Sequence, residues 1–241
     1  METNSKTLTI IAIVVIWLTG CASNRYVTNK DDPFEPMNRG FYKFNKTADA
    51  LYVKPISKFY EKLLPSALRK LISNFFNNVN EVPTIANSVL QGKGKQASDS
   101  LARLTINTTL GIGGLFDVAK LANIERHKED LGQTLAIWGY KNSSYIVLPI
   151  FGPSTIRDGI GLVGNAFLSP PYYLKPKWRN RYEASYFVNR RVELQETESL
   201  VTTVGVDEYS LVRNSYLQHR GYVIADEPEQ MPTDMLEEPP Q

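Results

Sequence analysis

Cysteine and histidine are scarce in this chain, which has one cysteine and two histidines among its 241 residues. A single cysteine cannot form an intramolecular disulfide. Neither His127 nor His219 has a second histidine, a cysteine or paired carboxylates at the spacing of metal ligands. The sequence therefore predicts no disulfide framework and no metal site, and nothing in it indicates a cofactor.

A strong excess of either charge is also lacking. The chain has 27 basic and 25 acidic residues, with a formal net charge of +2. Proteins that bind nucleic acids usually need a basic surplus, so no nucleic-acid partner is expected. Hydrophobic residues make up 42% of the chain, which suits one domain with a substantial core.

Local signatures of nucleotide binding and of serine hydrolases are missing. Gly111–Gly114 lack the third glycine of the dinucleotide fingerprint and follow a predicted helix rather than a strand. They predict instead a tight reversal where two helices approach closely. No Gly-x-Ser-x-Gly elbow occurs. The sequence alone does not exclude a catalytic triad assembled from distant residues.

No hydrophobic run is long enough to cross a membrane. The longest candidate, Leu8–Leu18, has only eleven residues, whereas a spanning helix needs roughly 20. A short polar stretch precedes it, and small residues follow, as in a secretory signal. We therefore predict that residues 1–20 form a signal peptide that is removed.

The only cysteine, Cys21, closes the tetrapeptide Leu-Thr-Gly-Cys directly after this segment. This pattern is typical of a lipobox, in which the cysteine is acylated and becomes the new N-terminus. The alternative is an ordinary signal peptide with an incidental cysteine. Two or three acyl chains would make membrane attachment effectively permanent. Residues 21–31 are then an acylated tether, and Ala22, rather than an aspartate, is compatible with sorting to an outer membrane.

Helical periodicity dominates the chain after about residue 32. Apolar residues recur at intervals of three and four within the ranges 41–52, 56–63, 68–79 and 85–90, each defining one helical face. Pro55, Pro65 and Pro83 are expected to kink or stop these helices. Ser66 is expected to be the N-cap of the helix that follows Pro65.

The remainder is less regular but also mainly helical. Residues 145–151 could form a short strand, although Pro149 argues against a central one. Pro153-Ser154 is interpreted as the start of a helix that ends before Pro170, and Asp207 as the cap of the last helix. His219-Arg220, near the end of that helix, are explained by the helix dipole. Further helices are expected over residues 101–108 and 179–203.

Two segments have a biased charge. The stretch Asp226–Gln241 has six acidic residues, four prolines and no basic residue, so residues 225–241 are predicted to be a disordered tail. The stretch Lys175–Arg191 is basic. It is either a solvated helix face or a surface for anionic headgroups or an acidic partner.

A series of short motifs runs through residues 32–222. They include Asp32–Arg39, Lys54-Pro55, Leu90-Gln91-Gly92, Asn107–Ala119, Gly132–Leu135, Tyr145–Pro149, Gly152–Ser154, Arg157-Asp158 and Asp207–Arg213 with Tyr216. In their residues and in their order, these motifs resemble the MlaA/VacJ lipoprotein family. Two departures are Leu104, where the family usually has phenylalanine, and Lys141–Ser144, where a glycine-rich turn is usual.

The resemblance implies a mainly α, ring-like single domain over residues 32–224. Its amphipathic helices would be embedded in the inner leaflet of the outer membrane around a central channel. The chain would be lipid-anchored on the periplasmic side. Family members remove mislocalised glycerophospholipids from the outer leaflet and pass them to a soluble periplasmic carrier, MlaC. Trimeric outer-membrane porins are their usual partners.

Six residues are candidates for the channel or its gate. Arg103, Arg157 and Asp158 are charged groups beside apolar, glycine-rich segments, where a polar path would need them. The alternative for Arg157 and Asp158 is an ordinary capping or surface pair. The other three, in the opening block of the family, are expected at a lid or gate: Asn38, Phe44 and Asn45.

Three functions compete at this stage. The first is a phospholipid-transfer channel, and on this hypothesis the protein is not an enzyme. The second is a membrane-associated phospholipid hydrolase. The third is a structural lipoprotein that binds a porin. A polar path beside an apolar surface favours the first, because a charged headgroup crosses hydrocarbon only at a cost of several kcal/mol.

Overall fold

A computed structural model describes residues 32–198 and 207–226 of the chain. These residues form one mainly helical domain with a single two-stranded sheet. The predicted signal peptide, tether and nearly all of the acidic tail lie outside the described residues. Within the described ranges, no helix has both the length and the apolar content needed to cross a bilayer.

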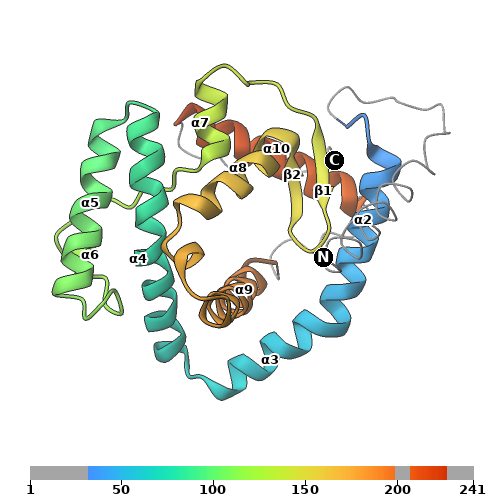
Figure 1. Cartoon of the computed structure of the whole chain (residues 1–241). Helices are drawn as coiled ribbons and strands as arrows, with labels where there is room; N and C mark the ends of the chain where they lie inside the picture. Colours follow the sequence, from blue (N-terminus) through green and yellow to red (C-terminus); the bar gives the residue numbers. More distant parts are fainter. Residues whose placement is uncertain (1–31, 199–206, 227–241) are drawn as a thin grey trace, which may run out of the picture.

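The first helical stretch is continuous but changes its winding near Pro55. Helix α2 covers Glu35–Ala48, a π-helical turn η1 covers Asp49–Val53, and α3 covers Lys54–Leu63. Pro55 lies in the first turn of α3, where its missing N–H costs least. Figure 1 shows α2, α3 and α4 following one another along an outer arc.

Helix α4 covers Ser66–Leu90 and differs from the prediction in two places. Pro65, not Ser66, occupies the N-cap position, and no side chain caps this end. Pro83 does not end the helix. Next to it, Thr84 Oγ1 donates to Asn80 O at 3.0 Å and Asn87 Nδ2 donates to Pro83 O at 2.8 Å. Pro83 is buried, so packing against neighbouring helices offsets the backbone hydrogen bond to Val79 O that proline cannot donate.

The predicted glycine reversal is present. Helix α5 covers Gly94–Thr109 and packs along α4, and the short helix α6, Val118–Leu121, follows the glycines. Gly114 has φ +91°, and a Cβ there would lie 2.5 Å from Asn78 Cβ of α4. Only glycine permits both this backbone conformation and this close approach.

A β-hairpin replaces part of a predicted helix. After α7, Leu131–Ile137, strand β1 covers Tyr145–Leu148 and pairs antiparallel with β2, Gly152–Thr155. The prediction of a helix start at Pro153-Ser154 was wrong, because Pro153 pairs with Val147 within the sheet. A two-stranded sheet has only edge strands, which tolerate proline. Helix α8 begins later and covers Ile156–Leu168.

The last elements of the domain are a 3₁₀ turn and two helices. A 3₁₀ turn η2, Pro170–Tyr173, leads into α9, Pro176–Glu198, and α10 covers Glu208–Ala225. Helix α9 packs against α3 and α4, and Figure 1 views it along its axis on the inner side of the arc. Asp207 precedes α10 as predicted, but its carboxylate pairs with Arg39 rather than capping the helix.

Polar side chains dominate the interior of the domain. Among the described residues, seven hydrophobic side chains are buried, against twenty polar or charged ones. The apolar stripe of η1 and α3 instead faces outward, and the only buried residue of α3 is Ser57. This arrangement is the reverse of a water-soluble domain. The exposed stripe consists of Leu51, Tyr52, Ile56, Phe59 and Leu63.

The apolar stripe of α4 is partly buried in the domain and partly exposed. Phe76 is buried, with its ring centroid 5.2 Å from that of Tyr182 and 5.3 Å from that of Tyr186 on α9. Leu68 and Phe75 remain exposed on the same helix. Part of this stripe therefore packs helix against helix, and part faces the surroundings.

Candidate functional site: an amphipathic cleft beside a buried charge network

A cleft of about 350 Å³ lies where the β-hairpin, α8 and α10 meet. Its lining is mixed. The apolar lining, called the apolar wall, comes from the hairpin and α8, through Leu148, Phe151, Pro153 and Leu162. The polar lining, called the polar wall, includes Asp130, Ser154, Asp158, Asn165, Tyr216, His219 and Arg220. The cleft therefore offers both apolar surface, which suits hydrocarbon, and polar groups, which suit a charged group.

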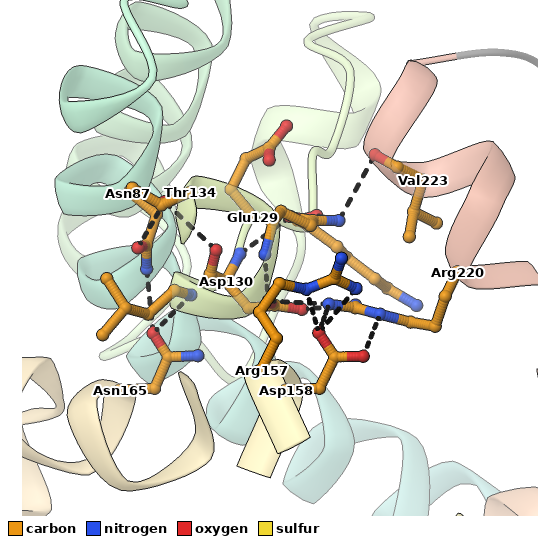
Figure 2. A network of polar contacts seen from close by, with 12 residues as sticks. Asn87, Glu129, Asp130, Thr134, Arg157, Asp158, Asn165, Arg220 and Val223 are labelled. Atoms are coloured by element: carbon orange, nitrogen blue, oxygen red, sulfur yellow. Dashed lines mark hydrogen bonds and ion pairs between the residues drawn. The ribbon is translucent and has the colours of Figure 1, made fainter. Parts of the chain in front are cut away.

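Arg220 of α10 is the centre of the polar wall. Its Nη1 donates to Asp130 Oδ2 at 2.7 Å, and its Nη2 donates to Asp158 Oδ1 at 2.7 Å. Figure 2 shows this guanidinium between the two carboxylates. Three residues that are far apart in sequence thus join the start of α7, the start of α8 and α10.

Local structure at the start of α8 positions Arg157 and Asp158. Thr155 is the N-cap, and its Oγ1 accepts a hydrogen bond from the Asp158 N–H at 3.1 Å. The Arg157 guanidinium contacts Asp158 Oδ1 at 3.0 Å and also donates to the backbone oxygens of Tyr140 and Lys141. The pair is buried, and the side chain that caps α8 is that of Thr155. A role of the pair in a channel stays a prediction.

The charges of this network are held fixed near neutral pH. Burial alone raises the pKa of Asp158, but attraction to Arg220 and hydrogen bonds from Arg220 and Tyr216 outweigh it, so the pKa lies below its usual range. Burial lowers the pKa of Arg220, yet its bonds to Asp130 and Asp158 leave that pKa above its usual value. The polar wall therefore carries permanent charges of both signs.

A second layer makes the wall rigid. Thr134 Oγ1 donates to Asn87 Oδ1 at 2.9 Å, and Asn87 Nδ2 donates to Asn165 Oδ1 at 2.9 Å, which links α4, α7 and α8 (Figure 2). Helices α7 and α8 also approach at glycines, since a Cβ on Gly161 would lie 2.4 Å from the backbone nitrogen of Gly132.

Asn38 and Asn45 hold the β-hairpin against α2. Asn38 Nδ2 donates to Tyr145 O at 3.1 Å, and its Oδ1 accepts from Val147 N at 2.9 Å. Asn45 bonds in the same way with Leu148 O, at 2.9 Å, and with Ile150 N, at 2.7 Å. They therefore fix the strand and turn that form the apolar wall. Their role as a gate, shared with the exposed Phe44, stays a prediction.

Arg103 belongs to a different network. It is buried between α4 and α5, where Nε donates to Glu81 Oε1 at 3.2 Å and Nη2 contacts Asp117 Oδ1 at 2.8 Å. Asn107 also donates to Asp117 Oδ1 at 3.0 Å. This network joins α4 and α5 to the glycine reversal and shares no contact with the cleft among the described residues. A channel-lining role for Arg103 remains untested.

Sequence reasoning missed Asp130, Tyr216 and Arg220 as parts of the site. The helix dipole does not explain Arg220, because its side chain turns away from the end of α10 to two carboxylates. Asp130 did carry a local signal, since Asp130 and Gln133 form a capping box at α7. No sequence spacing indicates that the Asp130 carboxylate also pairs with Arg220.

The cleft combines charged side chains with apolar ones. Among residues 32–198 and 207–226, no group of three or more histidine, cysteine, aspartate or glutamate side chains could hold a metal ion. The cleft offers instead fixed charges beside an apolar surface. An amphipathic molecule with a charged head fits this combination.

Comparison with known proteins supports a lipid-related role. The protein is 29% identical over 221 residues to the intermembrane phospholipid transport system lipoprotein MlaA of Escherichia coli K12, covering 90% of this chain and 88% of that protein. The MlaA of Haemophilus influenzae is 29% identical over 248 residues, covering 97% and 98% of the two chains.

A solved structure from work described as "Structural basis for maintenance of bacterial outer membrane lipid asymmetry" shares the fold. Its TM-score is 0.71 at 28% identity, over 81% of this chain and 100% of that chain. The sequence model of the MlaA lipoprotein family matches residues 30–223, from before α2 to the last turn of α10. The chain therefore belongs to the MlaA lipoprotein family.

Proposed function

We propose that this protein is a non-enzymatic phospholipid-transfer channel. It removes mislocalised glycerophospholipids from the outer leaflet of the outer membrane and passes them to a periplasmic carrier, which maintains lipid asymmetry. Membership of the MlaA family, whose curated relatives are named for intermembrane phospholipid transport, supports this function. The observation in the structure that carries it is the inverted distribution of apolar and charged side chains.

The outward stripe of η1 and α3 is suited to lipid. Leu51, Phe59 and Leu63 are each more than three-fifths exposed. Burying such a side chain away from water is worth about 1.5–3 kcal/mol, so a contiguous stripe seeks an apolar environment. Embedding these helices in the inner leaflet of the outer membrane, as a ring around a central channel, satisfies the stripe without a spanning helix.

The amphipathic cleft is the proposed polar part of the lipid path. A phospholipid flips slowly because its charged headgroup must leave water. The fixed charges of Asp130, Asp158 and Arg220 offer a headgroup polar partners, while Phe151 and Leu162 contact the acyl chains. Transport along such a wall needs no covalent chemistry.

The proposed setting follows from the same inference. Cys21, acylated, anchors the chain at the outer membrane on its periplasmic side. The partners are glycerophospholipids, an MlaC-like periplasmic carrier and a trimeric outer-membrane porin. The family name and the lipoprotein relatives support an envelope location.

A complementation experiment tests the proposal. Cells that lack the protein should accumulate phospholipid in the outer leaflet, measured by surface labelling of its amines, and the wild-type gene should restore asymmetry. Leu162→Asp, in the cleft, should fail to restore it. Leu101→Asp on α5, also more than two-fifths exposed, makes the same chemical change outside the cleft and should restore it.

Three results would overturn the proposal. If Leu162→Asp restores asymmetry as well as the wild type while present at equal levels, the cleft is not the path. If purified protein releases fatty acid from labelled phospholipid, the protein is a hydrolase. If asymmetry is independent of the protein but the porin still copurifies with it, the role is structural.

A further inference from the structure

A corner of aromatic and basic residues lies between α8 and α9, away from the lining of the cleft. We define the aromatic corner as residues 167–181, which include η2 and the first turns of α9. The stretch from Gly159 to Tyr182 has no aspartate or glutamate. Within it, the corner has four basic residues and four aromatic ones: Lys175, Lys177, Arg179, Arg181, Phe167, Tyr172, Tyr173 and Trp178.

The corner is well ordered by its own contacts. Tyr173 Oη donates to Phe167 O at 2.8 Å, and the rings of Phe167 and Tyr172 have centroids 4.7 Å apart. The backbone of η2 closes with Leu174 N donating to Pro171 O at 3.1 Å. Prolines on both sides of Lys175 further restrict the chain. The aromatic side chains are therefore held in position rather than being free to collapse.

These aromatic side chains are nevertheless exposed. Tyr173 is 74% exposed and Trp178 is 56% exposed. Leaving large rings in water forfeits the free energy that their burial would give. Tyrosine and tryptophan gather where a surface meets the interface of a bilayer, because one end of each ring is apolar and the other polar.

The basic side chains of the corner have no carboxylate partner among the described residues. Arg181 lies over the Trp178 ring, 5.1 Å from its centroid, and Arg179 lies 5.9 Å from the Tyr172 centroid. Lys175 and Lys177 are fully on the surface. Elsewhere on the domain, basic groups commonly pair with acids, as Arg191 does with Asp49 at 2.7 Å. The corner therefore presents uncompensated positive charge next to exposed rings.

A merely solvated helix face does not account for this combination. Charge alone would serve solubility, but it would not require rigid exposed rings beside it. An acidic protein surface would match the charge but would provide no apolar contacts for Tyr173 and Trp178. An anionic bilayer surface matches both features, because phosphates meet the cations while the rings enter the interface.

We propose that the aromatic corner binds anionic phospholipid headgroups in the membrane interface and fixes the depth of the domain there. The site is separate from the cleft, and it adds a lipid-class preference to the membrane attachment in the proposed function. On this inference, anionic lipids such as phosphatidylglycerol concentrate around Trp178 relative to zwitterionic lipids.

Trp178 can report this directly. The chain has three tryptophans. Trp17 leaves with the predicted signal peptide, so Trp138→Phe makes Trp178 the only tryptophan of the acylated protein. The full acylated protein is reconstituted with equal fractions of brominated phosphatidylglycerol or brominated phosphatidylcholine, and quenching of Trp178 fluorescence gives the relative association of each lipid. We expect stronger quenching by the brominated phosphatidylglycerol.

Charge removal supplies the matched comparison. Each basic residue near an anionic surface contributes roughly 1 kcal/mol, so Lys175→Gln with Lys177→Gln should lower the relative association of phosphatidylglycerol by about 30-fold. Raising the salt concentration should reduce the wild-type preference. Lys120→Gln with Lys141→Gln, which removes two other exposed lysines, should leave the preference unchanged.

Two results would overturn the inference. Equal quenching by both brominated lipids would remove the preference for anionic headgroups. Quenching of Trp178 by soluble acrylamide but by neither lipid would place the corner in water or against an acidic protein. Either result can occur while lipid asymmetry is still restored, and it would then count against this inference alone. Loss of transport with a retained preference for anionic lipid would count against the proposed function alone.

Discussion

The ion-pair network at the start of α8 allows a quantitative prediction for Asp158→Asn. The Asp158 side chain is 7% exposed and accepts hydrogen bonds from Arg157, Arg220 and Tyr216. An asparagine keeps the size of the side chain but removes its charge and one acceptor oxygen. The buried Arg157 and the partly buried Arg220 then keep only Asp130 as a nearby carboxylate.

The expected cost is large because a buried charge loses its partner. Breaking such a pair typically destabilises a protein by about 3–5 kcal/mol. We expect a loss in this range in the free energy of unfolding at neutral pH. A suitable control is Glu208→Gln, which removes the exposed partner of Lys46. Exposed pairs contribute about 0–1 kcal/mol, so the control should change stability little.

The stabilisation by the Asp158 carboxylate depends on pH, in a direction that follows from its pKa. The pKa of Asp158 is lower in the folded protein than in the unfolded chain, where it is about 3.9. The stabilisation is therefore complete above about pH 4 and is lost as the pH falls through the folded pKa. The difference in stability between wild type and Asp158→Asn should be constant near neutrality and should shrink in acid.

Denaturant unfolding followed by circular dichroism, in one detergent and over a series of pH values, measures this difference. A loss below about 1 kcal/mol would show that Asp158 behaves as an exposed group. A difference that stays constant well below pH 4 would mean that its ionisation does not contribute to stability. Either result would refute the reasoning from the buried network.

Other predictions concern packing and membrane contact. Gly161→Ala places a methyl group against the α7 backbone and should lower stability by about 1–3 kcal/mol, more than Gly164→Ala, which meets a movable leucine side chain; equal melting temperatures would contradict this. Phe59→Gln with Leu63→Gln should leave stability in detergent within about 0.5 kcal/mol, because both side chains are exposed, but should weaken binding of the acyl-free chain to vesicles. Cys21→Ser should misroute the protein in cells, yet the purified chain should still need detergent; an ordinary soluble monomer would make acylation the only anchor.

Local sequence signals identified most of the helices correctly. The periodicity of residues 68–79 and the position of Pro55 correspond to α4 and to the π-helical turn before α3. The errors fell where tertiary contacts override local preference. Pro83 remains inside α4, where it is buried, because tertiary packing offsets the one backbone hydrogen bond that a proline cannot donate. Pro153 enters a strand because β1 supplies a partner that the local sequence does not reveal.

The candidate site was only partly accessible to sequence reasoning. Arg157 and Asp158 were chosen as channel candidates because charged residues stood out in an apolar, glycine-rich segment. The structure buries both, with Asp158 in the lining of the cleft, while their role in a channel stays a prediction. Arg220 is separated from Asp158 by 62 positions in the sequence, and no periodic pattern relates them. Arg103 had the same appearance in the sequence as Arg157 but belongs to another network.

The sequence by itself determined the class of the protein: a mainly helical chain with amphipathic faces, one cysteine and the motifs of a lipoprotein family. Those features are local, since each depends on residues a few positions apart. Only the tertiary structure decided which way each face points. The sequence of an apolar stripe such as that of α3 is the same whether the stripe packs into a core or contacts a membrane. In this protein the interior is polar, with Asn38, Arg103 and Asp158 buried, so the stripe of α3 faces outward.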